Sequence, residues 1–190
     1  MVSPWLVRGV FLLALVALTA CGSSRRGYDA RDAQPRNVDD ACAIFAERPH
    51  WRSALEDASD KWGTPIEVKL AIIWRESRFV PNASPGTSSA YGFAQAIDGT
   101  WDWYRDATGN RRARRDDFGD SADFVGWYMN RTRDANGLSF YDPYRQYLAY
   151  HDGHTGYARG DWRSDFILQR AAQEVQTMAA RFRAQLATCS

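Results

Sequence analysis

The chain has 190 residues, of which 45% are hydrophobic and 25% are charged, enough apolar material for one globular domain with a buried core. The formal net charge is only +1 at pH 7, so the composition gives no support for nucleic acid as a partner. The sequence has no Gly-x-Ser-x-Gly elbow, phosphate-binding loop or Cys-x-x-Cys pair. It therefore does not support serine hydrolases of that type, nucleotide-binding proteins or zinc ribbons.

Residues 1–20 have the features of a signal peptide. Arg8 supplies a positive charge, and residues 10–18 form an apolar run too short to span a bilayer comfortably. The four residues that end at Cys21, Leu-Thr-Ala-Cys, resemble the bacterial lipobox. This resemblance implies cleavage before Cys21, a diacylglycerol on its thiol and, with Gly22 next, sorting to the outer membrane. The alternative is an ordinary signal peptide with a chance cysteine.

A tether and one further domain follow the signal peptide. Residues 21–37 contain few apolar side chains and no periodic pattern, which predicts a flexible tether. Residues 38–190 form the globular domain, and they contain Cys42 and Cys189. Two cysteines in an exported domain favour one disulfide, although two free thiols are the alternative.

The domain is predicted to be all-α. Apolar residues recur at helical spacing, and no segment alternates convincingly as a strand would. The turn-rich segment 81–90 and the charged segment 110–117 are expected to be loops. Helices are predicted over residues 38–48, 51–62, 64–79, 98–108, 121–132, 142–151 and 164–186.

The helix predicted over residues 64–79 is the central element of the chain. Thr64 is placed to cap its first N–H groups, Pro65 suits the first helical position, and Glu67 would complete a capping box. Glu76 then follows a run of residues with almost no polarity, near the negative end of the helix dipole. Both effects disfavour the ionised carboxylate, so we expect a raised pKa for Glu76. A solvated Glu76 paired with a neighbouring arginine is the alternative.

Three separated segments together resemble a known family. They are Trp-Arg-Glu-Ser-Arg-Phe at residues 74–79, Ser-Ala-Tyr-Gly-Phe-Ala-Gln at 89–95, and Tyr-Leu-Ala-Tyr-His-Asp-Gly at 147–153. Their order and spacing are similar to the Glu-Ser, Gly-Leu-Met-Gln and Ala-Tyr-Asn motifs of the lytic transglycosylase (SLT) domain. This resemblance implies a helical, goose-lysozyme-like fold. It also implies an enzyme without cofactor or metal that cleaves peptidoglycan glycan strands.

The resemblance assigns a role to each matching residue. Glu76 matches the sole catalytic carboxyl, which acts first as an acid and then as a base. Ser77 matches the serine beside it, and Gln95 matches the motif glutamine, which can hydrogen-bond sugar amides and hydroxyls. Tyr150 matches a tyrosine whose hydroxyl lies near the carboxyl. His151 replaces the motif asparagine, and because imidazole titrates near neutral pH, a charged His151 in the cleft would lower the pKa of Glu76.

Other polar and aromatic side chains are open to two interpretations. Tyr91, Trp101 and Trp103 could stack on sugar rings, but single aromatic residues more often belong to a core. We include Tyr91 among the expected substrate contacts. His151, Asp152 and His154 could form a metal cluster, but His-x-x-His on one helix turn has no third strong partner, so we expect no metal.

Two other functions remain open from the sequence alone. One is a lysozyme-like peptidoglycan hydrolase that uses water and a second carboxylate, such as Asp98 or Asp152. The other is a non-catalytic peptidoglycan-binding lipoprotein on the same fold. In each case we expect a monomer, bound to the membrane through a lipid anchor on the periplasmic side of the outer membrane.

Overall fold

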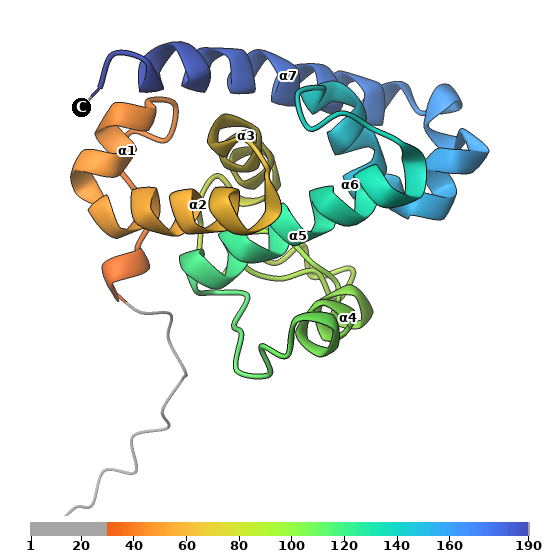
Figure 1. Cartoon of the computed structure of the whole chain (residues 1–190), viewed down its shortest axis with the longest axis horizontal. Coiled ribbons are helices and arrows are strands. Elements are labelled where there is room, and N and C mark those ends of the chain that lie inside the picture. The colour runs from red at the N-terminus through yellow and green to blue at the C-terminus, as the bar shows by residue number, and fades with distance from the viewer. Residues whose placement is uncertain (1–29, 190) are drawn as a thin grey trace, which may run out of the picture.

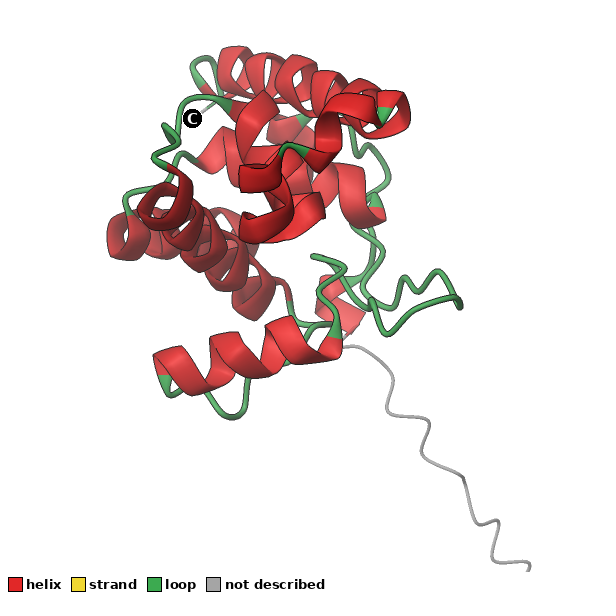
Figure 2. Ribbon diagram, turned by 90° about the vertical axis from the view of Figure 1, so that its right-hand side faces the viewer, coloured by secondary structure: helices red, strands yellow, loops and turns green. Residues whose placement is uncertain are grey.

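The computed structural model describes residues 30–189, and the part described is helical, as the sequence predicts (Figures 1 and 2). Within it, extended pairing is limited to one isolated bridge between Tyr91 and Ala96. Two short 3₁₀ helices are η1 (Ala30–Asp32) and η2 (Asp161–Ser164). The α-helices are α1 (Ala41–Glu47), α2 (Pro49–Trp62), α3 (Ile66–Ser77), α4 (Asp98–Thr108), α5 (Phe118–Asn136), α6 (Pro143–Arg159) and α7 (Phe166–Leu186).

Helix α3 lies in the middle of the fold and is covered on several sides. It packs against α7, α5 and α2, and Figure 1 shows α7 running along one side of it and α2 and α5 along the other. Its residues 68–74 are all buried, which accounts for the nearly continuous apolar run of this segment. Helix α4 extends from the rest of the bundle (Figure 2).

A cluster of buried aromatic rings joins the helices to the loop between α3 and α4. Trp51 of α2 stacks on Phe118 of α5, with ring centroids 3.9 Å apart. Phe79 and Phe93 from the loop pack against the same indole at 5.7 and 5.5 Å. Because such rings bury much apolar surface in preferred geometries, they fix the loop that carries the Gln95 motif.

The predicted cap of the central helix is wrong. Pro65, and not Thr64, is the N-cap of α3, and no side chain caps the helix there. The hydroxyl and carbonyl oxygens of Thr64 instead accept hydrogen bonds from the buried ammonium group of Lys69, at 3.0 and 2.8 Å. Glu67 does not complete a capping box; it pairs with Arg183 of α7 at 2.8 Å.

Several predicted helix boundaries also change. Helix α1 starts at Ala41, three residues after the predicted start, because Asp40 accepts hydrogen bonds from the first N–H groups. Helix α5 is longer than predicted at both ends. Helix α6 continues to Arg159 across a break at Gly153, whose φ of 72° and ψ of 163° are not helical.

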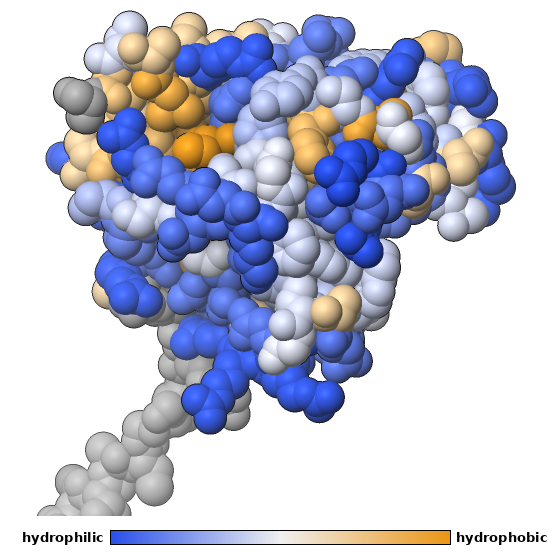
Figure 3. All heavy atoms as spheres, in the orientation of Figure 1, coloured by the Kyte–Doolittle hydropathy of each residue, from blue (hydrophilic) through white to orange (hydrophobic). Residues whose placement is uncertain are grey.

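The first α-helix is held to the end of the described segment, beside α7. A disulfide joins Cys42 of α1 to Cys189, which lies 147 positions later and just after α7. Figure 3 shows hydrophobic side chains gathered over this region, between α1 and α7. The predicted signal peptide and the lipidation site Cys21 lie outside the described residues. Within residues 30–189, no helix combines the length and the apolar character that a membrane span requires.

Candidate active site

Helix α3 ends in an unusual turn that places Glu76 at the edge of a cavity. Arg78 and Phe79 have φ values of 51° and 62°, in the left-handed region that non-glycine residues rarely adopt. Ser77 stabilises this turn, because its hydroxyl donates to the Ile73 carbonyl at 3.2 Å and accepts from the Phe79 N–H at 3.1 Å. Ser77 is buried and lies outside the cavity lining, so in this structure its contacts hold the end of the helix.

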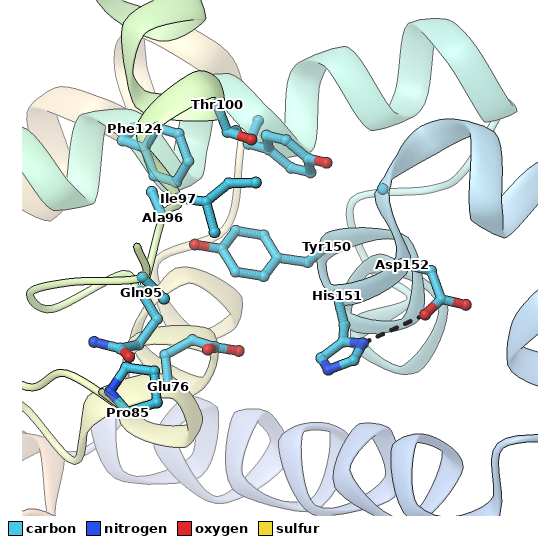
Figure 4. Close-up of a pocket in the computed structure, with 13 residues that line it drawn as sticks. Glu76, Pro85, Gln95, Ala96, Ile97, Thr100, Phe124, Tyr150, His151 and Asp152 are labelled. Atoms are coloured by element: carbon cyan, nitrogen blue, oxygen red, sulfur yellow. Dashed lines mark hydrogen bonds and ion pairs between the residues drawn. The ribbon is translucent and has the colours of Figure 1, made fainter. Parts of the chain in front are cut away.

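A cavity of about 450 Å³ opens beside Glu76 (Figure 4). Its walls come from the end of α3, the loop before α4, the start of α4, the middle of α5 and the break in α6. The predicted residues Glu76, Gln95, Tyr150 and His151 all line it. The complete lining is Glu76, Pro85, Ala90, Gln95, Ala96, Ile97, Thr100, Phe124, Tyr128, Tyr150, His151, Asp152 and Gly153.

The carboxyl group of Glu76 is poorly solvated. Burial raises its pKa above the ordinary value, while the Tyr147 hydroxyl and the nearby His151 and Arg75 partly oppose this shift. Its Oε1 atom is buried and has no hydrogen-bond partner among the described residues. The raised pKa predicted from the apolar run is therefore confirmed in direction. A carboxyl of this kind can retain a proton near neutral pH, as a general acid requires.

Gln95 lies on the same side of the cavity as Glu76 (Figure 4), and two hydrogen bonds hold its side chain. Its backbone has a φ of 49°, and its side-chain Nε2 donates to the carbonyls of Ala83 and Gly92 at 2.9 and 2.7 Å. The side-chain nitrogen is thus used within the protein. The carbonyl oxygen accepts no hydrogen bond from the described residues and remains able to accept one from a ligand.

Two tyrosines of α6 have different partners. The Tyr150 hydroxyl donates to the Ala94 carbonyl at 2.5 Å, and so joins α6 to the loop that carries Gln95. The hydroxyl that interacts with the Glu76 carboxyl belongs to Tyr147, which is almost fully buried. The family motifs assign no role to Tyr147. Its position three residues before Tyr150, on the same helix face, was the available signal.

His151 and His154, which lie on either side of the break in α6, contact different residues. His151 lines the cavity and pairs with Asp152, with 3.3 Å between Nδ1 and Oδ1. The ring of His154 instead stacks on Tyr128 and lies 3.0 Å from the Thr132 hydroxyl. Among residues 30–189, no group of three His, Cys, Asp or Glu side chains is placed to hold a metal ion.

The comparison with protein families gives one match. The model of the "Transglycosylase SLT domain" matches residues 9–189, which is nearly the whole chain. The chain belongs to this family. The resemblance seen in three short motifs is therefore confirmed at the level of the family. Membership implies a transglycosylase that acts on peptidoglycan in the cell envelope. The search of curated proteins found no match to the chain.

This SLT domain places some expected contacts away from the cavity. The Cζ atom of Arg115 lies over the ring of Tyr91, 5.6 Å from the ring centroid. Tyr91 lines a separate groove. Trp101 is buried in the core, whereas Trp103 is 45% exposed. Asp98 pairs with Arg115 at 2.8 Å and does not line the cavity. Of the two carboxylates considered as partners for Glu76, Asp152 alone is in the cavity wall.

Proposed function

We propose that this SLT-domain protein is a peptidoglycan lytic transglycosylase in which Glu76 is the single catalytic carboxyl. The observation that carries this proposal is the buried, poorly solvated carboxyl of Glu76 in the cavity wall. The reaction is cleavage of the bond between N-acetylmuramic acid and N-acetylglucosamine, with formation of a 1,6-anhydro end.

In the first step, Glu76 acts as the acid. Its proton passes to the glycosidic oxygen, the bond from that oxygen to C1 of the muramic acid breaks, and the leaving sugar departs with a hydroxyl group. The 2-acetamido oxygen can assist by bonding to C1, so that a second protein carboxylate is not required. Glu76 is left as a carboxylate.

In the second step, the same carboxylate acts as the base. It takes the proton from the C6 hydroxyl of the muramic acid as O6 forms a bond to C1 and the bond from the acetamido oxygen to C1 breaks. The product is a 1,6-anhydro sugar, and Glu76 has its proton again. Gln95, whose carbonyl oxygen is free of protein donors within the described residues, is suited to orient a sugar amide or hydroxyl.

A lysozyme-like hydrolase is the second candidate, and the presence of Asp152 in the same cavity favours it. Such an enzyme would use Asp152 to activate water or to stabilise the positive charge at C1. Mass spectrometry of fragments released from purified sacculi separates the two reactions. Anhydro ends would support the transglycosylase, and reducing ends would support the hydrolase.

The substitution Glu76→Gln tests the role of the carboxyl. We expect it to abolish the release of muropeptides from sacculi, because the amide cannot give or take the proton. Binding to sacculi and the melting temperature should stay close to the parent values. Glu67→Gln is a matched control on the opposite end of α3, where Glu67 pairs with Arg183, and it should remain active. Undiminished lysis by Glu76→Gln would contradict the assignment and favour a different catalytic group.

We also propose that Cys21 carries a lipid that anchors the enzyme to the outer membrane, facing the periplasm. The lipobox-like sequence supports the lipid, and a peptidoglycan substrate supports a location in the envelope. Metabolic labelling with a radioactive fatty acid, followed by separation of the inner and outer membranes, tests both statements.

A further inference from the structure

We propose that the imidazole of His151, in its protonated form and paired with Asp152 in the cavity wall, stabilises the Glu76 carboxylate that forms during the reaction. This inference rests on the proposed function, because it concerns the state of Glu76 between its two proton transfers. It assigns a catalytic contribution to a residue at which this chain departs from the family motif.

The need for such a charge follows from the environment of Glu76. When the acid gives its proton to the glycosidic oxygen, a negative charge remains on a carboxyl group that burial leaves poorly solvated. The Tyr147 hydroxyl interacts with this carboxyl, but its Oε1 atom has no hydrogen-bond partner among the described residues. An uncompensated buried carboxylate is costly, so the first step is slow unless a positive charge is nearby.

The structure places His151 where it can supply this charge. Figure 4 shows the Glu76 carboxyl directed toward the side of the cavity on which His151 and Asp152 lie, with the imidazole between the two acidic groups. Nδ1 of His151 is 3.3 Å from Oδ1 of Asp152. Because imidazolium donates from both nitrogens, a donor bond to Asp152 leaves Nε2 directed elsewhere as a second donor.

Asp152 is the acidic partner of His151 in the cavity wall. Its side chain is only 15% exposed, so its charge is weakly screened by water. Its Oδ2 atom is buried and has no hydrogen-bond partner in the described residues. Within the described residues the side-chain hydrogen bond of Asp152 is therefore the one to His151, and a hydrogen bond between opposite charges is stronger than one between neutral groups.

The other charged or titratable groups around Glu76 do not replace His151. Arg75, on the same helix, is paired with Glu174 of α7 at 3.5 Å. Burial raises the pKa of the hydroxyls of Tyr147 and Tyr150 on α6, so both are neutral at physiological pH. The same is true of Tyr128, which α5 contributes to the cavity and whose pKa burial raises to about 12.

His151 keeps its proton through both steps. In the first step the proton on Glu76 moves to the leaving oxygen, and the imidazolium faces the carboxylate that results. In the second step the carboxylate takes the C6 proton and becomes neutral again. The histidine therefore acts through charge and neither gains nor loses a proton in the cycle.

The test is the pH dependence of anhydro-muropeptide release from sacculi by the parent enzyme, His151→Asn and Asp152→Asn. His151→Asn introduces the amide of the family motif and removes the charge. We expect a rate lowered about 10-fold at low pH, with the alkaline fall in rate shifted upward by about one pH unit, because Glu76 holds its proton more tightly without a neighbouring cation. Asp152→Asn should have the opposite effect on the profile. The alkaline fall in rate should move to lower pH, because the variant removes a negative charge from the cavity that Glu76 lines and so favours the Glu76 carboxylate.

His50→Asn is the matched control, since His50 forms a comparable pair with Asp32, at 2.8 Å, and does not line the cavity. Its pH profile should match that of the parent enzyme. A loss of rate in His151→Asn without any shift of the profile would overturn the inference and leave His151 a purely structural role. Unchanged rates and profiles in both cavity variants would overturn it as well. Failure of the proposed function is distinct: the parent enzyme would then release no anhydro product, or Glu76→Gln would remain active.

Discussion

Two ionisable side chains of α3 are buried with opposite consequences. Glu76 lies at the end of the helix, where burial raises its pKa and so favours the neutral acid. Lys69 lies two turns earlier with no exposed surface, and burial lowers its pKa to about 7 from an ordinary value of 10.5. The ammonium group donates to Thr64 and, at 2.5 Å, to Ser59. The Glu76 carboxyl lines the cavity, and the Lys69 ammonium group joins α3 to the end of α2.

The lowered pKa of Lys69 predicts a dependence of stability on pH. Between pH 7 and about 10 the unfolded chain binds this proton and the folded chain does not, so the free energy of unfolding should rise with pH. The slope from this group is at most about 1.4 kcal/mol per pH unit. Lys69→Met should remove it in urea denaturation at a series of pH values. Lys61→Met, at a half-exposed lysine, should keep the parent slope. Parallel curves for Lys69→Met and the parent would contradict the argument.

At the scale of single residues, the sequence predicts the environment of Glu76 better than its partners. The apolar run before Glu76 is a local pattern, and the burial that it predicts is present. Tyr147 was missed because its contact with Glu76 joins α6 to α3 across more than 70 positions. Tyr91 was placed among the substrate contacts, but its stacking under Arg115 depends on the path of a loop that the sequence pattern does not define.

Helix α6 is one element in name but changes direction at the cavity. Gly153 has φ 72° and ψ 163°, a conformation that is essentially restricted to glycine. The residues just before it, His151 and Asp152, line the cavity, and His154 just after it faces Thr132. Gly153 therefore separates a helical segment whose last side chains line the cavity from one whose first side chain packs against α5.

This break predicts the effect of Gly153→Ala. We expect a loss of about 1–3 kcal/mol of stability, because a Cβ disfavours this backbone conformation, together with a loss of activity as His151 and Asp152 shift. Gly137→Ala is the control, since Gly137 also has a positive φ of 68° but ends α5 with no other atom within 4 Å of an added Cβ. It should lose about 1 kcal/mol and keep its activity. Full activity in Gly153→Ala at a temperature where it is folded would show that the break is not needed.

Element boundaries were predictable where the determinants are local. The prediction of α4 over residues 98–108 agrees with the structure, since periodicity and Gly109 define it within one segment. The start of α3 was not predictable in the same way. Thr64 is a good capping residue by type. In the folded protein, however, the Thr64 hydroxyl accepts a hydrogen bond from the buried ammonium group of Lys69 and does not cap the helix.

At the scale of the whole molecule, contacts between distant segments hold the cavity walls in place. The Trp51 cluster fixes the loop with Gln95, and the bond from Tyr150 to Ala94 joins that loop to α6. The sequence predicts the helices and the family, but these pairings depend on how the helices pack. Two kinds of contact join α1 to α7. One is the disulfide, and the other is the side chain of Gln185, which accepts a hydrogen bond from the Ala41 N–H and donates one to the Asp39 carbonyl.

The disulfide between Cys42 and Cys189 closes most of the domain into one loop, so its removal should affect stability more than activity. In the chain-entropy model a loop of this length is worth about 4–5 kcal/mol, through restriction of the unfolded chain. The double variant Cys42→Ser, Cys189→Ser should lose up to that amount in guanidinium denaturation, and the parent under reducing conditions should behave alike. Both should retain lytic activity at low temperature, because the disulfide is remote from the cavity lining. A loss below about 1 kcal/mol would show that the Gln185 contacts alone close α1 onto α7.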